Sequence, residues 1–182
     1  MNFRYIILFF LTFSLFHSQT IDDNLVLWNP SKKLTIDDFG IKTTKENEQL
    51  SYGQFSIDSN IKGFDFLTKN FNKKVRNYFI KSASWINTTK DVEISLKYQQ
   101  TVFDISEIYA RNFRKELKNK RKQILKGFEI LDELNQKSAT DFSNRRLQYN
   151  NETNYGRIAD KQIEWEKQIQ KELEESKEYS YQ

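Results

Sequence analysis

The chain has 182 residues and a formal net charge of +4, and it contains one histidine and no cysteine. Without cysteine the chain cannot form disulfides, Cys/His zinc sites or a Cys-His nucleophile pair. The single histidine, His17, lies near the N-terminus, so the rest of the chain has no histidine general base. A bound metal would depend on oxygen ligands, which favour Ca²⁺ or Mg²⁺. The mild net charge does not indicate a polyanionic partner.

The composition indicates one folded domain rich in helices. Fifteen Phe, nine Tyr and three Trp can supply a packed interior, whereas disordered chains are poor in aromatic residues. Five Gly and one Pro are too few for an all-β protein built on many tight turns. We therefore predict an α+β fold, with one domain that is long enough for a core of its own.

The first residues have the pattern of a secretory signal peptide. Arg4 supplies the positive charge, residues 5–16 are mostly apolar, and Ser18 offers a small residue for cleavage. The apolar run is shorter than the roughly 20 residues that a membrane-spanning helix needs, and an uncleaved anchor is the alternative. We expect a signal peptide over residues 1–18 and export to the periplasm or the extracellular space. The mature chain, 19–182, then has no transmembrane helix and has its core at about 25–173.

Residues 25–90 have the character of a β-rich region. Apolar and polar residues alternate imperfectly over 52–61, and a second apolar run follows at 63–67. Asn60 and Gly63 between these runs indicate a hairpin turn. Two later runs, 75–80 and 85–86, are amphipathic, and their periodicity fits a strand or a short helix equally well. We expect a small antiparallel sheet in this half of the chain.

From Asp91 onward the pattern predicts three helices, because apolar residues recur every three or four positions. The clearest stripe consists of Tyr98, Val102, Ile105, Tyr109, Phe113 and Leu117. Gly127 should end or kink the first helix. The second helix is expected at about 128–147 and the third at about 158–173, after which residues 174–182 should fray.

Four short segments, in order along the chain, carry a family resemblance. They are residues 34–39 (Leu-Thr-Ile-Asp-Asp-Phe), 84–86 (Ser-Trp-Ile), 98–111 (beginning Tyr-Gln-Gln-Thr-Val-Phe-Asp-Ile) and 149–156 (Tyr-Asn-Asn-Glu-Thr-Asn-Tyr-Gly). Together they resemble the bacterial family catalogued as domain of unknown function 922, whose members are described as secreted zinc-dependent proteases. The family's helix reads His-Glu-Gln-x-His-Phe-Asp-Ile, and its later segment reads Tyr-Asp-x-Glu-Thr-x-His-Gly. The resemblance implies a zincin-like arrangement of a sheet followed by three helices.

The chain departs from this family at the positions that carry the chemistry. In a His-Glu-x-x-His helix two imidazoles on one face hold Zn²⁺, and the glutamate polarises the attacking water. The resemblance places Tyr98 and Val102 at these two ligand positions, Gln99 at the general-base position and Tyr155 at the third ligand position. Valine has no donor atom, and a glutamine amide cannot accept a proton as a carboxylate does. We therefore expect no catalytic residue, no metal and no cofactor.

Two interpretations of the residues at these positions are possible. Tyr98 and Val102 belong to the apolar stripe, so we favour an interior in which carbon fills the former metal site, because an empty cavity would cost stability. The alternative is an open cleft that binds a ligand or peptide without cutting it. Three further polar residues, Asp104, Arg111 and Glu152, are interpreted as structural: a buried tie between the first two and a brace for the turn after the third. A calcium site built on such acids is less favoured, because no calcium-loop spacing is present.

A basic run lies between Arg111 and Lys126, with eight basic residues in 111–126. A solvated helix face that pairs with the acid-rich last helix is the favoured interpretation. The alternative is a binding module for anionic surfaces, although we expect no nucleic-acid partner.

These observations predict an exported, catalytically inactive metalloprotease-like domain of bacterial type, with a structural or binding role and a protein or peptide as a possible ligand. A hydrolase with a carboxylate-based site in place of zinc is the first alternative. The anionic-surface module formed by the basic helix 111–126 is the second.

Overall fold

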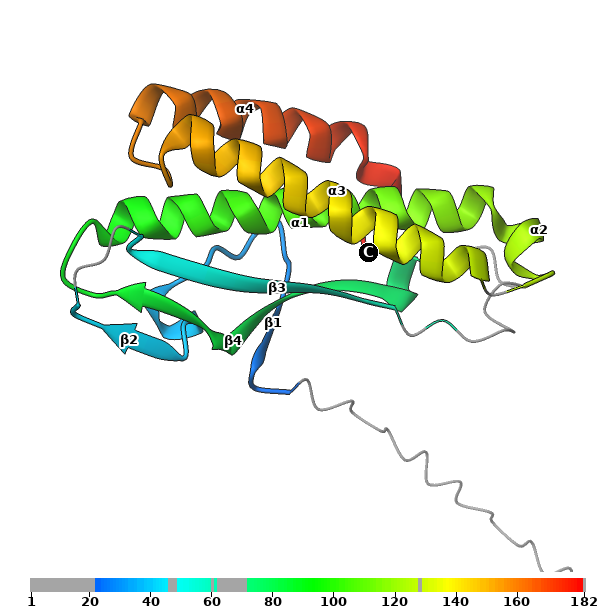
Figure 1. Ribbon diagram of the computed structural model, residues 1–182, viewed down its shortest axis with the longest axis horizontal. Helices are drawn as coiled ribbons and strands as arrows, with labels where there is room; N and C mark the ends of the chain where they lie inside the picture. Colours follow the sequence, from blue (N-terminus) through cyan, green and yellow to red (C-terminus); the bar gives the residue numbers. More distant parts are fainter. Residues whose placement is uncertain (1–21, 46–48, 60, 62–71, 128, 182) are drawn as a thin grey trace, which may run out of the picture.

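The computed structural model describes residues 22–45, 49–59, 61, 72–127 and 129–181. The expected signal peptide and the expected hairpin turn at Asn60 and Gly63 lie outside the described residues. A small sheet forms one layer, the long helix α1 lies against it, and the helices α3 and α4 lie side by side over α1 (Figure 1). The predicted α+β class is confirmed.

Within the described residues the sheet has four strands, and their pairings all run through the longest one. The strands are β1 (Leu25–Leu27), β2 (Ile41–Thr43), β3 (Ser51–Ser59) and β4 (Val75–Asn87). The two runs that fitted a strand or a short helix are thus both parts of β4. Strands β1 and β3 pair with β4 in antiparallel fashion, but β2 pairs with it in parallel. The sheet is therefore mixed and not wholly antiparallel, because β2 and β3, which follow each other in the chain, run in opposite directions along β4.

A local irregularity in β3 brings the sheet close to α1. The register of β3 against β4 shifts between Tyr52 and Gln54. A Cβ atom on the intervening Gly53 would lie 2.6 Å from Oε1 of Gln99 on α1. The glycine is needed for this close approach of strand and helix.

Three long helices and two short turns follow the sheet. They are α1 (Val92–Asn119), α2 (Arg121–Ile124), α3 (Glu129–Thr153), α4 (Ala159–Glu175) and the 3₁₀ turn η4 (Lys177–Tyr179). The first helix ends at Asn119, before Gly127, because the chain tightens into the single turn of α2. The second and third helices run beyond their expected ends at 147 and 173.

The segment after Leu173 is ordered where it was expected to fray. The backbone carbonyl of Tyr179 accepts a hydrogen bond of 2.9 Å from Nη1 of Arg114, and that of Glu178 accepts one from Asn72 at 2.9 Å. These bonds hold residues 177–181 between α1 and the beginning of β4. In the part of the chain that the structure describes, no helix is long and apolar enough to cross a membrane, as expected.

Helix α1 is the centre of the fold. It contacts β3 and β4 on one side and α3 and α4 on the other, so its predicted stripe is only one of its buried faces. Apolar residues of the stripe, such as Val102, Ile105 and Leu117, are completely buried. Polar side chains of α1, among them Gln99, Asp104 and Glu107, are buried as well. Buried polar groups need hydrogen-bond partners within the protein.

Candidate functional site

The structure brings together positions that the resemblance assigns to a metal site. Tyr98 and Val102 lie one turn apart on α1, and Tyr155 lies in the turn that joins α3 to α4. The ring centroids of Tyr98 and Tyr155 are 5.9 Å apart, although the two residues are far apart in the sequence. Three of the four positions that the resemblance assigns to the site thus converge around the first half of α1.

Aromatic rings fill this region. The Tyr98 ring stacks on Tyr149 of α3 with a centroid distance of 5.4 Å, and Tyr149 meets Trp165 of α4 edge-on at 5.2 Å. Tyr98 and Val102 have relative exposures of 1% and 0%. The hollow beside Tyr155 measures about 10 Å³, close to the space of a single water molecule. The region is therefore a packed interior and not an open cleft.

The tyrosine hydroxyls of this interior are held as neutral donors. The hydroxyl of Tyr98 donates to Oδ1 of Asn150 at 2.6 Å, and that of Tyr149 donates to Oε1 of Gln162 at 2.6 Å. Burial raises the pKa of Tyr98 to about 12, although the nearby Arg146 acts in the opposite direction. Burial also raises the pKa of Tyr149. Neither phenol is available as a phenolate near neutral pH.

Gln99, which the resemblance places at the general-base position, faces the sheet. Its Nε2 donates to the hydroxyl of Ser51 at 3.0 Å, and the residue is fully buried. Its Oε1 has no hydrogen-bond partner among the described residues, which carries a cost in free energy. A glutamate here would bury a charge, and charges are far more costly to bury than amides.

These residues do not fit the catalytic zinc that the resemblance implies. Val102 offers no donor atom, and the phenol of Tyr98 is engaged with Asn150. Neutral phenols and amides are poor substitutes for the imidazole and carboxylate ligands of zinc enzymes. Among the described residues, no group of three or more His, Cys, Asp or Glu side chains could hold a metal ion.

The turn between α3 and α4 is closely fitted to α1. Asn154, Tyr155 and Gly156 have positive φ angles of 46°, 57° and 83°, a left-handed conformation that only glycine adopts readily. Thr153 supports the turn, because its hydroxyl donates to the carbonyl of Tyr149 at 2.7 Å and accepts from the amide of Gly156 at 3.1 Å. A Cβ atom on Gly156 would lie 2.8 Å from Cβ of Tyr98.

Glu152 lies at this end of α3 and links it to α4. Its carboxylate accepts hydrogen bonds from the indole of Trp165 and from Gln148, both at 2.8 Å. These two bonds, that from Gln148 first, lower the pKa of Glu152. The residue thus connects the two helices, two residues before the left-handed segment begins at Asn154.

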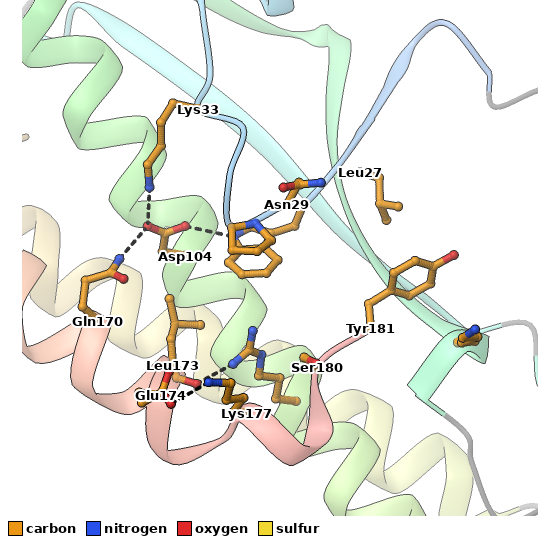
Figure 2. A pocket seen from close by; sticks show the side chains of 14 residues that line it. Leu27, Asn29, Lys33, Asp104, Gln170, Leu173, Glu174, Lys177, Ser180 and Tyr181 are labelled. Carbon is orange, nitrogen blue, oxygen red and sulfur yellow. Dashed lines mark hydrogen bonds and ion pairs between the residues drawn. The ribbon is translucent and has the colours of Figure 1, made fainter.

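The second candidate region is a cavity of about 610 Å³ on the other side of α1 (Figure 2). It lies between the segment after β1 and the end of α4. Asp104 is buried at its edge, where it accepts hydrogen bonds from the indole of Trp28 at 2.8 Å and from Gln100 at 2.9 Å. Lys33 and Gln170 approach the same carboxylate from opposite walls, at 3.8 and 3.4 Å (Figure 2). Burial raises the pKa of Asp104, and the charge of Lys33 opposes this shift.

The expected tie between Asp104 and Arg111 is not formed, because Trp28 lies between them. The indole donates to Asp104, and the guanidinium of Arg111 lies 5.2 Å from the centre of the Trp28 ring. The carboxylate partner of Arg111 is Glu107, at 3.1 Å from its Nε. Trp28 thus contacts both Asp104 and Arg111, which were predicted to contact each other directly.

Glu107, Arg111 and Arg114 form a buried group, called here the Glu107 cluster. Oε1 of Glu107 also accepts from Nη1 of Arg114 at 2.8 Å. The three residues have relative exposures of 1%, 5% and 1%. Arg114 donates further to the carbonyl of Val75, and desolvation lowers the pKa of its guanidinium. Two of the eight basic residues of the run are therefore internal, and the exposed basic surface is smaller than the sequence indicates.

Some residues that organise these two regions are not indicated by the sequence. Trp28 and the role of Arg114 were missed, although the spacing of Glu107, Arg111 and Arg114 places all three on one side of a helix. Tyr149 lies in one of the resemblance segments, yet nothing in the sequence indicates that its ring would stack on Tyr98.

Comparisons with protein-family models, with curated proteins and with solved structures find no match to this chain.

Proposed function

We propose that this chain is a catalytically inactive relative of the secreted zinc-dependent proteases that it resembles, exported from a bacterial cell and retained for a structural or binding role. A zincin-like arrangement belongs to the same proposal. Its support is that the resemblance segments contact one another through α1: Leu34 donates to Gln100 at 2.9 Å, and Tyr98 donates to Asn150. Segments that share one core are what a common fold requires.

The observation that carries the proposal is the packed interior at Tyr98, Val102 and Tyr155. A hydrolytic site needs an accessible space for substrate and an activated water, and here the space is occupied by stacked rings. The substitutions are mutually adapted, since the hydroxyl of Tyr98 has a partner and Gly156 leaves room for its Cβ atom. Such adaptation supports a stable domain that has dispensed with catalysis. A protein or peptide as the ligand of its outer surface is a further part of the proposal.

The test is a zinc determination on the purified chain together with a general peptidase assay. We expect less than stoichiometric zinc and no hydrolysis that a chelator abolishes. Stoichiometric zinc with chelator-sensitive hydrolysis would falsify the proposal.

A matched variant tests the resemblance itself. Replacing Tyr98, Val102 and Tyr155 together with histidine places three imidazoles where the family carries its ligands. If the resemblance is correct, this variant binds zinc and the parent chain does not. A folded variant without zinc affinity contradicts the family assignment, and circular dichroism establishes whether it is folded.

The two alternatives have less support. A carboxylate-based hydrolase needs a second acid near Asp104, yet the contacts of Asp104 are to Trp28, Gln100, Gln170 and Lys33. The anionic-surface module loses Arg111 and Arg114 to the interior. Binding to anionic vesicles that weakens as salt increases would restore this second alternative.

A further inference from the structure

The cavity of about 610 Å³ has a mixed lining with an excess of positive charge. Its basic residues are Lys33, Lys73, Arg111 and Lys177, and its acidic residues are Asp104 and Glu174. Both acids already have cationic partners, Lys33 at 3.8 Å and Lys177 at 2.9 Å. The volume lies within the range of about 300–1,000 Å³ that small-molecule sites occupy.

Arg111 is the residue of this lining that indicates a ligand. Its Nε donates to Glu107 at 3.1 Å, and its Nη1 donates to the carbonyl of Leu173 at 2.5 Å. Its Nη2 makes no hydrogen bond to any described residue, although the side chain is only 5% exposed and borders the cavity. A guanidinium has five N–H donors. Because Nη2 is not completely buried, it is open to the cavity, where a ligand could accept its hydrogen bonds.

The charge of the Glu107 cluster indicates that the acceptor on the ligand is an anion. One carboxylate faces two guanidiniums, so the cluster carries one net positive charge inside the protein. Backbone carbonyls of Leu173, Val75 and Tyr179 stabilise it in part. A buried charge without a full counter-charge is costly, and an anion beside Arg111 would remove this cost.

The remaining lining suits an apolar body. Leu27, Trp28, Pro30, Leu173 and Tyr181 contribute to the walls. Figure 2 shows Leu27 and Tyr181 on one side of the cavity, with Lys177 and Glu174 on the side of α4. A simple inorganic anion would leave these apolar walls uncovered.

We propose that this cavity binds a small amphipathic carboxylate, with the carboxylate on Nη2 of Arg111 and an aromatic or aliphatic body against Trp28 and Tyr181. This site goes beyond the proposed function and uses none of the degenerate metal-site positions. A result that refutes one of the two proposals therefore does not affect the other.

Calorimetric titration of the full chain with 3-phenylpropionate tests the proposal. The neutral amide of the same acid and inorganic phosphate serve as comparison ligands. We expect the acid to bind at least about tenfold more tightly than the amide, because a hydrogen bond to a charged group is worth more than a neutral one. Equal binding of acid and amide, no binding of the acid at millimolar concentration, or phosphate binding as tightly as the acid would overturn the assignment.

The indole N–H resonance of Trp28 locates the binding. This group donates to Asp104 at the edge of the cavity, so its proton shift should move as the acid is added. Binding that leaves this resonance unmoved would place the acid elsewhere and contradict the proposal.

Two variants with one control test the charge. Arg111→Lys keeps the charge but lacks the forked donors, and we expect at least about a tenfold loss of affinity. Arg111 also joins α1 to α4, so its replacement can change folding as well as binding. Lys177→Glu therefore provides a second test, at an exposed position. Lys171→Glu on α4 is its control, since both lysines pair with a neighbouring glutamate but Lys171 does not line the cavity. We expect a several-fold loss for Lys177→Glu alone, and equal effects of the two would refute the site.

Discussion

Gly156 is the position where one added methyl group should reveal how tightly the interior around Tyr98 and Tyr155 is packed. Its φ of +83° is left-handed, and an ideal Cβ there would lie 2.8 Å from Cβ of Tyr98. Gly156→Ala therefore combines two costs. The left-handed conformation costs an L-residue roughly 1–2 kcal/mol. Forcing extra carbon into a close-packed interior costs typically about 1–3 kcal/mol.

Together these costs predict that Gly156→Ala lowers the free energy of unfolding by about 2–5 kcal/mol. For a chain of this size each kcal/mol corresponds to about 2–4 °C in Tm. Urea unfolding followed by circular dichroism measures the loss, and the slope of the transition should not change.

Gly127→Ala is the matched control. Around Gly127 no atom of the described residues lies within 4 Å of an added Cβ, and its φ is not left-handed. This substitution should be neutral or stabilise the protein by up to about 1 kcal/mol, through the lower entropy of the unfolded chain. If Gly156→Ala is as stable as Gly127→Ala, the turn does not pack against Tyr98 as described, and the argument for a filled site fails.

Three further predictions concern the buried polar groups. Glu107→Gln should cost about 3–5 kcal/mol in urea unfolding, since it leaves the two guanidiniums of the Glu107 cluster without their carboxylate; a loss below 1 kcal/mol would contradict its role. For Asp104, whose pKa is raised by burial in the folded state, the native protein holds its proton longer than the unfolded chain, so stability falls as pH rises above 3.8. Asp104→Asn should lack this fall. If the free energies of unfolding of the two proteins change equally with pH across the acidic range, the prediction is refuted. For Tyr98, with its pKa raised to about 12, stability should fall as pH rises above 10, and Tyr98→Phe should lose up to about 3 kcal/mol less over that range.

The helical half of the fold was largely predictable, because α1 and α4 each carry an apolar stripe with a helical period. The pattern of α1 hides how central the helix is, because periodicity does not mark Gln99 and Glu107 as buried. Asp104 was expected to be buried, but its partner is Trp28 and not Arg111. Those partners, such as Trp28 and Ser51, come from distant strands and loops. Periodicity reports one face of a helix and does not report which polar residues meet across the fold.

The sheet was less predictable for a different reason. Strand β2 contributes only the residues Ile41–Thr43, too few to show an alternation or a direction, so its parallel pairing left no signal in the sequence. The end of the chain was misjudged because residues 177–181 are polar. They are held by backbone carbonyls, as at Tyr179, and every residue carries such a carbonyl whatever its side chain. Backbone groups leave no trace in a sequence.

The central position of α1 has a consequence for how the chain can fold. The sheet uses one side of this helix, and α3 and α4 use the other, so both layers share a single element. Neither layer has a core of its own once α1 is removed. The chain should therefore fold as one cooperative unit that is completed only when α4 and the segment after it are present, because Arg111 and Arg114 depend on carbonyls from Leu173 and Tyr179. Exchange of the amide hydrogens of α1 with solvent should accordingly require global unfolding.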